Sequence, residues 1–230
     1  MYRGLAVAVV IPAYNEEERI GRTVRSVPAF VDHVLVVDDG STDRTLHRLQ
    51  KENRRGLEVI YHRTNGGVGA AIISGYRRAM ERKADLVAVM AGDNQMDPRD
   101  LPCLLDAFMD PALGYAKGNR FARREVWWRM PPLRLAGNIV LSYLTRRATG
   151  LNHVFDSQCG YTVISGAALD RLHLAEIYGG YGYCNDLLGH LRCAGVKVKD
   201  VPVRTVYSGE SLGIRMSTLL HPIMSVLVKT

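Results

Sequence analysis

The chain has 230 residues, 47% of them apolar, a composition that excludes a mainly disordered protein and suffices for one large α/β domain. Lys and Arg number 30 against 23 Asp and Glu, so the formal net charge is +7. This charge favours anionic partners such as nucleotides, phosphorylated lipids or an anionic membrane, while nucleic-acid binding has nothing else in its favour and is not expected. No apolar run reaches the roughly 18 residues that a membrane-spanning helix needs.

The first half of the chain is predicted to alternate between strands and helices. Leu5–Ile11 is a continuous apolar run, as in a strand that is buried on both faces. Similar patterns predict strands over 31–37, 57–62 and 86–90, and helices over 16–27, 42–53, 67–82 and from Pro98 onward. Strands that alternate with helices indicate βαβ units and a mostly parallel sheet.

The second half has a weaker pattern. A strand is predicted over Tyr115–Lys117, and the basic segment Arg120–Arg134, with two tryptophans and a proline pair, is predicted to be a loop or mobile segment. Helices are predicted over 135–147 and 182–194, and a half-buried strand over 196–206. No repeat or obvious linker interrupts the chain, so residues 1–230 are expected to form a single domain.

Polar, turn-forming clusters follow each of the first four predicted strands. They are Pro12–Glu16, Asp38–Asp43, Asn65–Gly69 and Ala91–Gln95. In an open parallel sheet, ligands bind beyond the carboxyl ends of the strands, which lie along one edge. Any one of these clusters could serve only as a turn or a helix cap, but the four together predict one wall of a ligand site.

Two common nucleotide sites are excluded by their motifs. A dinucleotide site needs G-x-G-x-x-G after the first strand, but that strand ends without a glycine, and in the cluster after the third strand Ile72 stands where the third glycine would fall. A P-loop needs G-K-[ST], which does not occur. The sequence therefore favours a carboxylate-rich nucleotide site, in which acidic side chains contact base and ribose and hold a divalent cation against a diphosphate.

Seven segments in a fixed order resemble one known family. The segments VVIPAYNEEERI, VVDDGSTDRT, NGGVGAA, AGDNQMDP, KGNRF, DSQCGYT and YGYCNDLL are similar to those of family 2 glycosyltransferases with the GT-A fold, nearest to the polyprenyl-phosphate (dolichol-phosphate-mannose-synthase-like) branch. The resemblance runs from about Val7 to Arg215. It implies an α/β fold with a Rossmann-type, mostly parallel central sheet flanked by helices, and an inverting sugar transfer from a UDP- or GDP-sugar.

The resemblance divides the chain into a donor-binding half over about 1–100, an acceptor-binding half over about 101–215 and a membrane-proximal tail over 214–230. It implies nucleotide-binding roles for Pro12, Ala13, Tyr14, Glu16, Asp38, Asp39, Gly69 and Asp93. The carboxylate of Asp39 would accept hydrogen bonds from the base, either from the imide N–H of uracil or from N1–H and N2–H₂ of guanine. The alternative is that Asp38 and Asp39 only end a strand and cap a helix.

The expected metal site departs from the family pattern. Many relatives have Asp-x-Asp-x-Gln, whereas Ala91 replaces the first Asp here and only Asp93 and Gln95 match. One carboxylate, one amide oxygen, two donor phosphate oxygens and waters can still complete an octahedron around Mg²⁺ or Mn²⁺, so we expect metal dependence with weak metal binding in the absence of donor. Asp97 is a further candidate ligand, or alternatively the cap of the helix that Pro98 opens.

The acceptor site is expected in the basic second half. By resemblance, Arg120 meets the acceptor phosphate with its forked guanidinium, Arg134 is the second phosphate ligand, and Asp156 faces the acceptor. Asp186 matches the base that removes a proton from a hydroxyl acceptor. A phosphate monoester is already anionic near neutral pH, so with such an acceptor Asp186 would only orient a basic residue or close the site. Catalytic roles are thus expected for Asp93, Arg120 and Asp186.

The resemblance to the lipid-phosphate branch also implies a peripheral protein on the cytoplasmic face of the membrane. Trp127 and Trp128 would lie at the membrane–water interface, together with the apolar tail at 219–228. The alternative for the tryptophans is a pair in a core loop. The seven histidines form no ligand cluster and are expected to be structural or exposed.

Three other functions stay open at this stage. A glycosyltransferase with a hydroxyl acceptor, such as a saccharide, would need Asp186 as its base. A nucleotidyltransferase is disfavoured, because the segment after the first strand lacks a glycine-rich loop with a basic residue. A non-catalytic module that binds nucleotide sugars is suggested only by Ala91.

Overall fold

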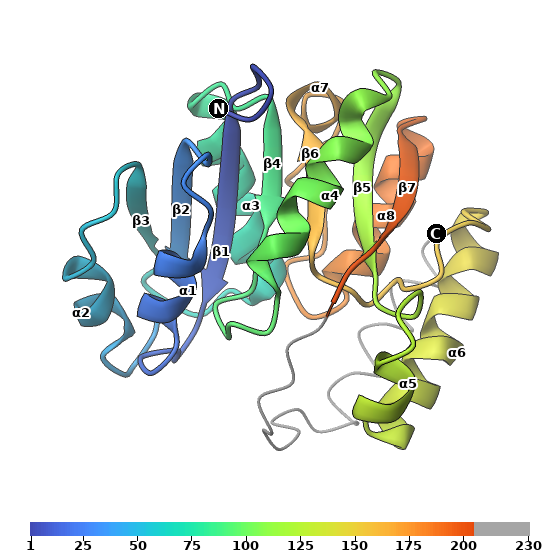
Figure 1. Ribbon diagram of the computed structural model, residues 1–230, viewed down its shortest axis with the longest axis horizontal. Helices are drawn as coiled ribbons and strands as arrows, with labels where there is room; N and C mark the ends of the chain where they lie inside the picture. Colours follow the sequence, from blue (N-terminus) through green and yellow to red (C-terminus); the bar gives the residue numbers. More distant parts are fainter. Residues whose placement is uncertain (205–230) are drawn as a thin grey trace.

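The computed structural model describes residues 1–204, and one seven-stranded sheet runs through them (Figure 1). Its strands are β1 Val7–Ala13, β2 His33–Asp38, β3 Leu57–Tyr61, β4 Leu86–Val89, β5 Leu113–Asn119, β6 Thr162–Ser165 and β7 Lys197–Pro202. They lie in the order β3-β2-β1-β4-β6-β5-β7, and all neighbours are parallel except β6, which is antiparallel to β4 and β5. The mostly parallel sheet predicted from the sequence is confirmed.

Helices cover both faces of this sheet. They are α1 Ile20–Ser26, α2 Thr45–Gln50, α3 Val68–Glu81, α4 Leu101–Asp106, α5 Val126–Arg129, α6 Pro132–Thr149, α7 Gly166–Leu169 and α8 Tyr183–Cys193. In the view of Figure 1, α1 and α4 lie in front of the sheet and α3 and α8 behind it. Val9 and Ile11 of β1 belong to the core under α1 and α4, whereas Ala8 and Val10 belong to the core under α3 and α8. Burial on both faces explains why this strand is a continuous apolar run.

One predicted loop is partly helical. The segment Arg120–Arg134 contains α5, and α6 already begins at Pro132 instead of near residue 135. A proline is tolerated in the first turn of a helix, because its φ is already helical and its missing N–H has no partner there to lose. The proline pair therefore starts α6, and the loop prediction was wrong for these residues.

Three other stretches differ from the sequence pattern. β6, with only four residues, was not predicted, because so short a run carries no readable periodicity. The helix expected from Pro98 onward begins as the 3₁₀ turn Pro98–Asp100 and continues as α4. The strand predicted over 196–206 is β7, which ends at Pro202.

No helix among residues 1–204 is long and apolar enough to cross a membrane. The proposed tail at 214–230, with its apolar residues 219–228, lies outside the described residues.

A buried polar network joins α6 to α8 and fixes the acceptor-side half of the predicted site. The hydroxyl of Thr145 lies 3.2 Å from Asn185 Oδ1, which also accepts a hydrogen bond from Gln158 Nε2 at 2.9 Å. Ser157 N–H donates to Ser142 Oγ at 3.0 Å. Because such bonds are directional, they set how α6 and the loop before β6 sit on α8 more narrowly than apolar packing alone would.

Candidate functional site

The ends of β1 and β2 lie side by side at the carboxyl edge of the sheet. Ala13 is in register with Asp38, and the backbone N–H of Asp39 donates to Ala13 O at 2.8 Å. Just beyond, Glu16 N–H donates to Thr45 Oγ1 at 2.8 Å. The loop after β1 is therefore tied to the start of α2, and the first two predicted clusters form one continuous surface.

Asp38 has a turn-forming position. Its side chain is completely buried, and Oδ1 accepts from the backbone N–H of Ser41 at 3.1 Å. Oδ2 has no hydrogen-bond partner within residues 1–204. The Ser41 contact fits the structural alternative that the sequence left open for Asp38, and its nucleotide-binding role stays a prediction.

Asp39 is the centre of a hydrogen-bond network. Oδ1 accepts from Gly66 N–H at 3.0 Å and lies 2.6 Å from His62 Nδ1, while Oδ2 accepts from Gly67 N–H at 2.8 Å. The other ring nitrogen of His62 lies 2.9 Å from Ser74 Oγ on α3. Asp39 therefore joins the ends of β2 and β3 to the glycine loop before α3, and its side chain keeps 4% of its surface exposed.

Gly69 makes a close approach to a distant segment. A Cβ on Gly69 would lie 2.5 Å from the carbonyl oxygen of Tyr178 and 2.7 Å from the side chain of Tyr183. Next to it, Ala70 N–H donates to Gly179 O at 2.9 Å. The residue expected to bind nucleotide is thus buried in a backbone contact, and it lets the segment before α8 dock on the start of α3.

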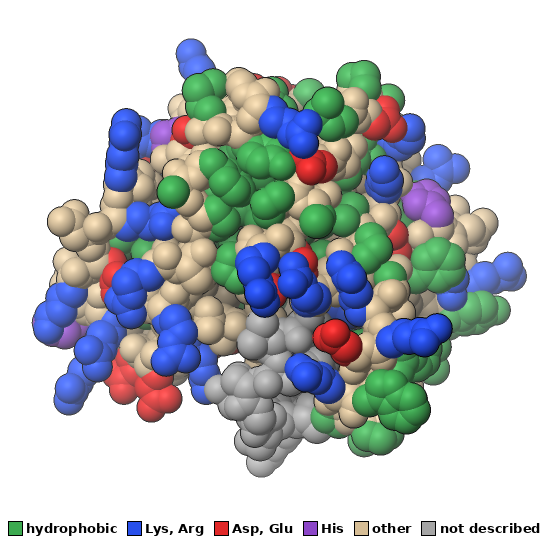
Figure 2. Space-filling view, in the orientation of Figure 1, with side chains coloured by type: hydrophobic (Ala, Val, Ile, Leu, Met, Phe, Trp, Pro, Cys, Tyr) green, Lys and Arg blue, Asp and Glu red, His purple; other side chains and the backbone are tan. Residues whose placement is uncertain are grey.

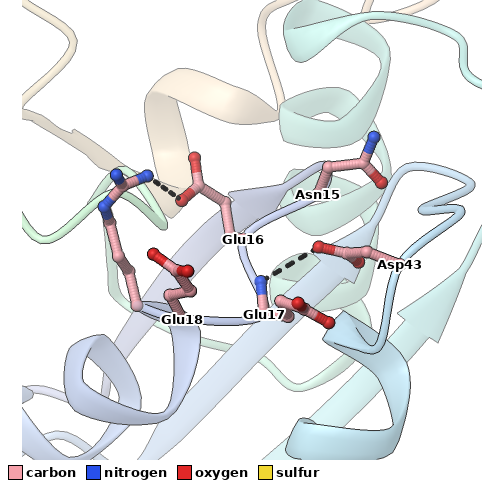
Figure 3. A pocket seen from close by; sticks show the side chains of 6 residues that line it. Asn15, Glu16, Glu17, Glu18 and Asp43 are labelled. Atoms are coloured by element: carbon pink, nitrogen blue, oxygen red, sulfur yellow. Dashed lines mark hydrogen bonds and ion pairs between the residues drawn. The ribbon is translucent and has the colours of Figure 1, made fainter.

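A small hollow lies at the end of β1, with a volume of about 220 Å³ (Figure 3). It is lined by Asn15, Glu16, Glu17, Glu18, Arg19 and Asp43. Glu16 pairs with Arg19 at 3.2 Å, and Asp43 accepts from the backbone N–H of Glu17 at 3.2 Å. Tyr14, just before the hollow, is 45% exposed. The excess of carboxylates disfavours a phosphate here but suits ligand groups that donate hydrogen bonds, such as ribose hydroxyls.

Asp93 and Gln95 share one turn after β4. The carboxylate of Asp93 accepts from Gln95 N–H at 3.0 Å, around Asn94, which has a φ of 60°. Gly92 N–H donates to Pro12 O at 3.3 Å, so this turn lies beside the end of β1. Residues 1–204 contain no group of three His, Cys, Asp or Glu side chains able to hold a metal ion. The two oxygen-bearing side chains suit a hard cation that takes its remaining ligands from a diphosphate and water.

Asp97 caps the following helical turn. Its buried carboxylate accepts from Arg99 N–H at 3.0 Å, and Arg99 Nη2 donates to the other oxygen at 2.7 Å. These hydrogen bonds, assisted by the charge of Arg204, lower the pKa of Asp97. The capping role considered for Asp97 is confirmed.

Arg120 and Asp156, two predicted acceptor residues, form a buried ion pair with each other. Arg120 donates from Nε to Oδ2 at 2.7 Å, from Nη2 to Oδ1 at 2.9 Å and from its backbone N–H to Oδ2 at 3.1 Å. Burial alone would raise the pKa of Asp156, but the charge and hydrogen bonds of Arg120 outweigh it and hold that pKa below its ordinary value. The guanidinium fork is therefore satisfied largely inside the protein, with 11% of the side chain exposed.

Arg134 on α6 and Asp93 on the donor side act on the same tyrosine. Burial raises the pKa of Tyr181, the positive charge of Arg134 opposes this rise, and the negative charge of Asp93 adds to it. The charges of Arg134 and Asp93 thus act in opposite senses on the pKa of Tyr181, a residue of the segment before α8.

Asp186 lies in the first turn of α8 and holds the segment in front of it. Its Oδ2 accepts from the backbone N–H of Tyr178 at 2.6 Å and lies 3.6 Å from His190 Nε2. This contact fixes the chain that docks on Gly69. Asp186 therefore has a visible anchoring role in the absence of any acceptor.

Residues 8–172 match one protein-family model, described as Glycosyl transferase family 2. They span well over half of the chain and include all four strand-end loops. The chain belongs to this family. The family resemblance read from the motifs is thereby confirmed.

Relatives of this family 2 glycosyltransferase align along most of their length. UDP-N-acetylglucosamine--dolichyl-phosphate N-acetylglucosaminyltransferase of Methanococcus voltae is 29% identical, over 90% of this chain and 88% of its own. Undecaprenyl-phosphate mannosyltransferase of Micrococcus luteus is 30% identical, over 88% and 84%. Glucosyl-3-phosphoglycerate synthase from Mycobacterium tuberculosis, solved with Mn²⁺, UDP and glucosyl-3-phosphoglycerate, superimposes with a TM-score of 0.75 at 20% identity, over 98% of this chain and 80% of the other. The expected GT-A-like fold is confirmed.

Three residues that contact or influence the candidate site residues were missed by sequence reasoning. His62 contacts Asp39. The pKa of Tyr181 responds to the charges of Arg134 and Asp93. Lys117 is completely buried and donates to Cys159 O at 2.6 Å, in the segment that also carries Asp156. Only His62 had a usable signal, because it ends the third predicted strand at the same sheet edge as the acidic clusters. The other two depend on tertiary packing that spacing does not reveal.

Proposed function

We propose that this glycosyltransferase moves a sugar, with inversion, from a UDP- or GDP-sugar to a polyprenyl or dolichyl phosphate at a membrane surface. The observation that carries the proposal is an exposed apolar and basic surface on the same helix as Arg134. That surface can meet a lipid bilayer while Arg134 meets the phosphate head group. A hydroxyl acceptor would not require such a surface.

This surface, here called the α5–α6 surface, consists of Trp127, Trp128, Leu133, Val140 and Tyr143, whose exposed fractions lie between 50% and 88%. In Figure 2, hydrophobic side chains lie beside Lys and Arg side chains over the region of α5 and α6 at lower right. The arginines that flank it and are exposed are Arg123, Arg124, Arg129 and Arg147. Large apolar groups surrounded by positive charge fit the interface of an anionic membrane.

The known relatives support a phosphate acceptor. The Methanococcus voltae and Micrococcus luteus proteins are named as transferases to dolichyl phosphate and undecaprenyl phosphate, respectively. The polyprenol monophosphomannose synthase of Mycolicibacterium smegmatis is 28% identical over 90% of this chain. For the present chain, these relatives favour a polyprenyl or dolichyl phosphate acceptor.

The donor is proposed to lie along the ends of β1, β2 and β4. The base would approach Asp39, the ribose hydroxyls the carboxylate-lined hollow beside Glu16, and the diphosphate the turn with Asp93 and Gln95. Those two side chains would hold Mg²⁺ or Mn²⁺, which neutralises the charge of the leaving diphosphate when bound. Complexes of the mycobacterial neighbour with Mn²⁺ or Mg²⁺ and UDP support this division of labour.

The proposed reaction needs no catalytic base. An oxygen of the acceptor phosphate forms a bond to the anomeric carbon, and the bond from that carbon to the nucleoside diphosphate breaks from the opposite side, its electron pair leaving with the diphosphate. The phosphate is already anionic near neutral pH. Arg134 would align it, the Arg120–Asp156 pair would position the acceptor side, and Asp186 would hold the segment bearing Tyr181 across the site.

Transfer assays on the purified protein test this proposal. Polyprenyl phosphate in anionic vesicles is mixed with the protein, Mn²⁺ and either a UDP-sugar or a GDP-sugar. The lipids are then extracted, and the glycolipid product is identified by mass spectrometry. We expect a glycosyl phosphate lipid with one of the donors. A product formed only with a saccharide or another hydroxyl acceptor would replace the lipid-phosphate assignment by the hydroxyl alternative.

A further inference from the structure

The identity of the donor base follows from the surroundings of Asp39, if the proposed transfer from a nucleotide sugar is correct. We infer that the base is uracil and not guanine, because the Asp39 carboxylate keeps a single acceptor position for it. The sequence left both bases open.

A carboxylate has about four lone-pair positions for hydrogen bonds, two on each oxygen. Oδ1 of Asp39 uses both of its positions, one for Gly66 N–H at 3.0 Å and one for His62 at 2.6 Å. Oδ2 accepts from Gly67 N–H at 2.8 Å. Among the contacts within residues 1–204, one position on Oδ2 is left, and the side chain as a whole is 4% exposed.

The three contacts are held in place by the fold. Gly67 has a φ of 92°, and a Cβ there would lie 2.7 Å from Gly179 O, so the glycine loop is fixed by its conformation and by the segment before α8. His62 Nδ1 faces a carboxylate and therefore carries the proton, and Nε2 then accepts from the hydroxyl of Ser74 at 2.9 Å. A base cannot displace these donors without breaking the loop or leaving the imidazole unpaired.

The two bases make different demands on such a site. Uracil presents one imide N–H between two carbonyl groups, so one acceptor satisfies it. Guanine presents N1–H and N2–H₂ side by side and needs two acceptors in the same direction. With only one, guanine keeps a buried donor unpaired, which should weaken its binding by about tenfold or more.

Titration calorimetry with UDP and with GDP, each in the presence of Mn²⁺, tests the inference. The unaltered protein should bind UDP about tenfold or more tightly than GDP. His62→Ala returns a lone pair on Oδ1, so the ratio of the two affinities should narrow. His62→Gln, whose amide N–H can replace the ring N–H, should restore the preference for UDP over GDP. Ser74→Ala is the matched control, because it leaves the acceptors of Asp39 unchanged and should keep the ratio.

The possible outcomes distinguish a wrong donor base from a wrong proposed function. GDP binding as tightly as UDP would overturn the uracil inference and leave the proposed glycosyl transfer intact. A UDP preference that His62→Ala leaves unaltered, in a variant whose thermal unfolding shows it to be folded, would overturn the lone-pair explanation. If neither nucleotide binds, the inference and the proposed function both fail.

Discussion

The donor edge of the sheet and the α5–α6 surface are built on opposite principles. At the donor edge, Asp38 and Asp39 are buried and their oxygens hold backbone N–H groups of neighbouring loops. On the α5–α6 surface, Trp128 is 88% exposed and Leu133 62% exposed. In the first region, polar groups hold the loops in a fixed conformation through hydrogen bonds. In the second region, apolar side chains remain in contact with water.

This difference indicates two kinds of ligand. A preformed polar edge suits a small, rigid ligand such as a nucleotide, because little ordering entropy is lost on binding. An exposed apolar surface ringed by arginines suits a large and fluid partner such as a membrane. The comparison predicts that changes at the edge alter chemistry and stability, whereas changes on the surface alter only access to the acceptor.

The largest effect is expected at Asp93. Asp93→Ala removes the one carboxylate of the proposed cation site, so transfer should fall by about 10³-fold, and a chelator should do the same to the unaltered protein. Ala91→Asp should tighten Mn²⁺ binding without donor, measured by calorimetry. Asp170→Ala, at an exposed carboxylate that ends α7, is the control. Undiminished transfer in chelator would show that Asp93 and Gln95 hold no essential metal.

Arg120→Ala should act first on folding. It leaves the Asp156 carboxylate buried and unpaired, a change that costs about 3–5 kcal/mol of unfolding free energy. Arg124→Ala, at an exposed arginine of the same loop, should cost less than about 0.5 kcal/mol. Denaturant unfolding measures both.

A double variant then separates stability from chemistry at this pair. Arg120→Met with Asp156→Leu replaces the ion pair by apolar groups and should recover much of the lost stability. Transfer should stay impaired while UDP binding is retained, if Arg120 positions the acceptor side as proposed. Full recovery of transfer in the double variant would show that Arg120 and Asp156 have no direct role in transfer.

Asp200 on β7 gives the acceptor half a pH-dependent weakness. Burial raises its pKa from 3.8 to about 6, although it accepts from Phe155 N–H at 2.8 Å. The pKa of Asp200 is higher in the folded than in the unfolded protein, so ionising this carboxyl lowers the free energy of unfolding. This loss of stability is absent below about pH 4, grows up to about pH 6 and is complete above it. Asp200→Asn should thus stabilise the protein at pH 8 by about 1–3 kcal/mol and have little effect at pH 4. Urea unfolding at both pH values measures this, and equal effects at both would contradict it.

Much of the fold was readable from the sequence because β1, β2 and β4 are buried on both faces and are connected through segments with the 3.6-residue apolar period of helices. Continuous apolar runs therefore located the strands, and the polar residues after them located one edge. The start of α6 was misjudged because a proline pair can either break a chain or open a helix, and spacing does not separate the two. Four residues of β6 were too few to read.

The motifs named candidate site residues but not the contacts that those residues make. Motif order assigned both Arg120 and Asp156 to the acceptor, yet nothing in their spacing shows that they pair with each other. In the same way, the seven histidines looked unremarkable in sequence, while the fold puts His62 against Asp39. Contacts between segments this far apart depend on strand order, which composition and periodicity do not determine.

A smaller effect is expected on the α5–α6 surface. Replacing Trp127 and Trp128 together by Ala should weaken binding to anionic vesicles by about tenfold or more, since burying even one large apolar side chain is worth about 1.5 kcal/mol. Transfer to a short-chain, water-soluble acceptor phosphate should not change. Tyr61→Ala, at a 53% exposed aromatic residue on the edge strand β3, is the matched control for vesicle flotation. Equal losses in both variants would exclude a specific membrane surface.

The smallest effect is expected for Asp186→Asn, and it divides the two acceptor classes. The asparagine Oδ1 can still accept from Tyr178 N–H, so the segment before α8 should keep its place. With a polyprenyl phosphate acceptor no proton has to be removed, and transfer should fall only a few-fold. With a hydroxyl acceptor, loss of the base costs about 10²–10⁴-fold. Asp186→Leu removes the hydrogen bond to Tyr178 with either acceptor. Its activity therefore measures how much transfer is lost when the segment before α8 is no longer held. Asparagine removes the charge of Asp186 but keeps its contact with Tyr178. An inactive Asp186→Asn enzyme with normal UDP affinity would therefore mean that Asp186 takes a proton during transfer. The acceptor would then be a hydroxyl compound.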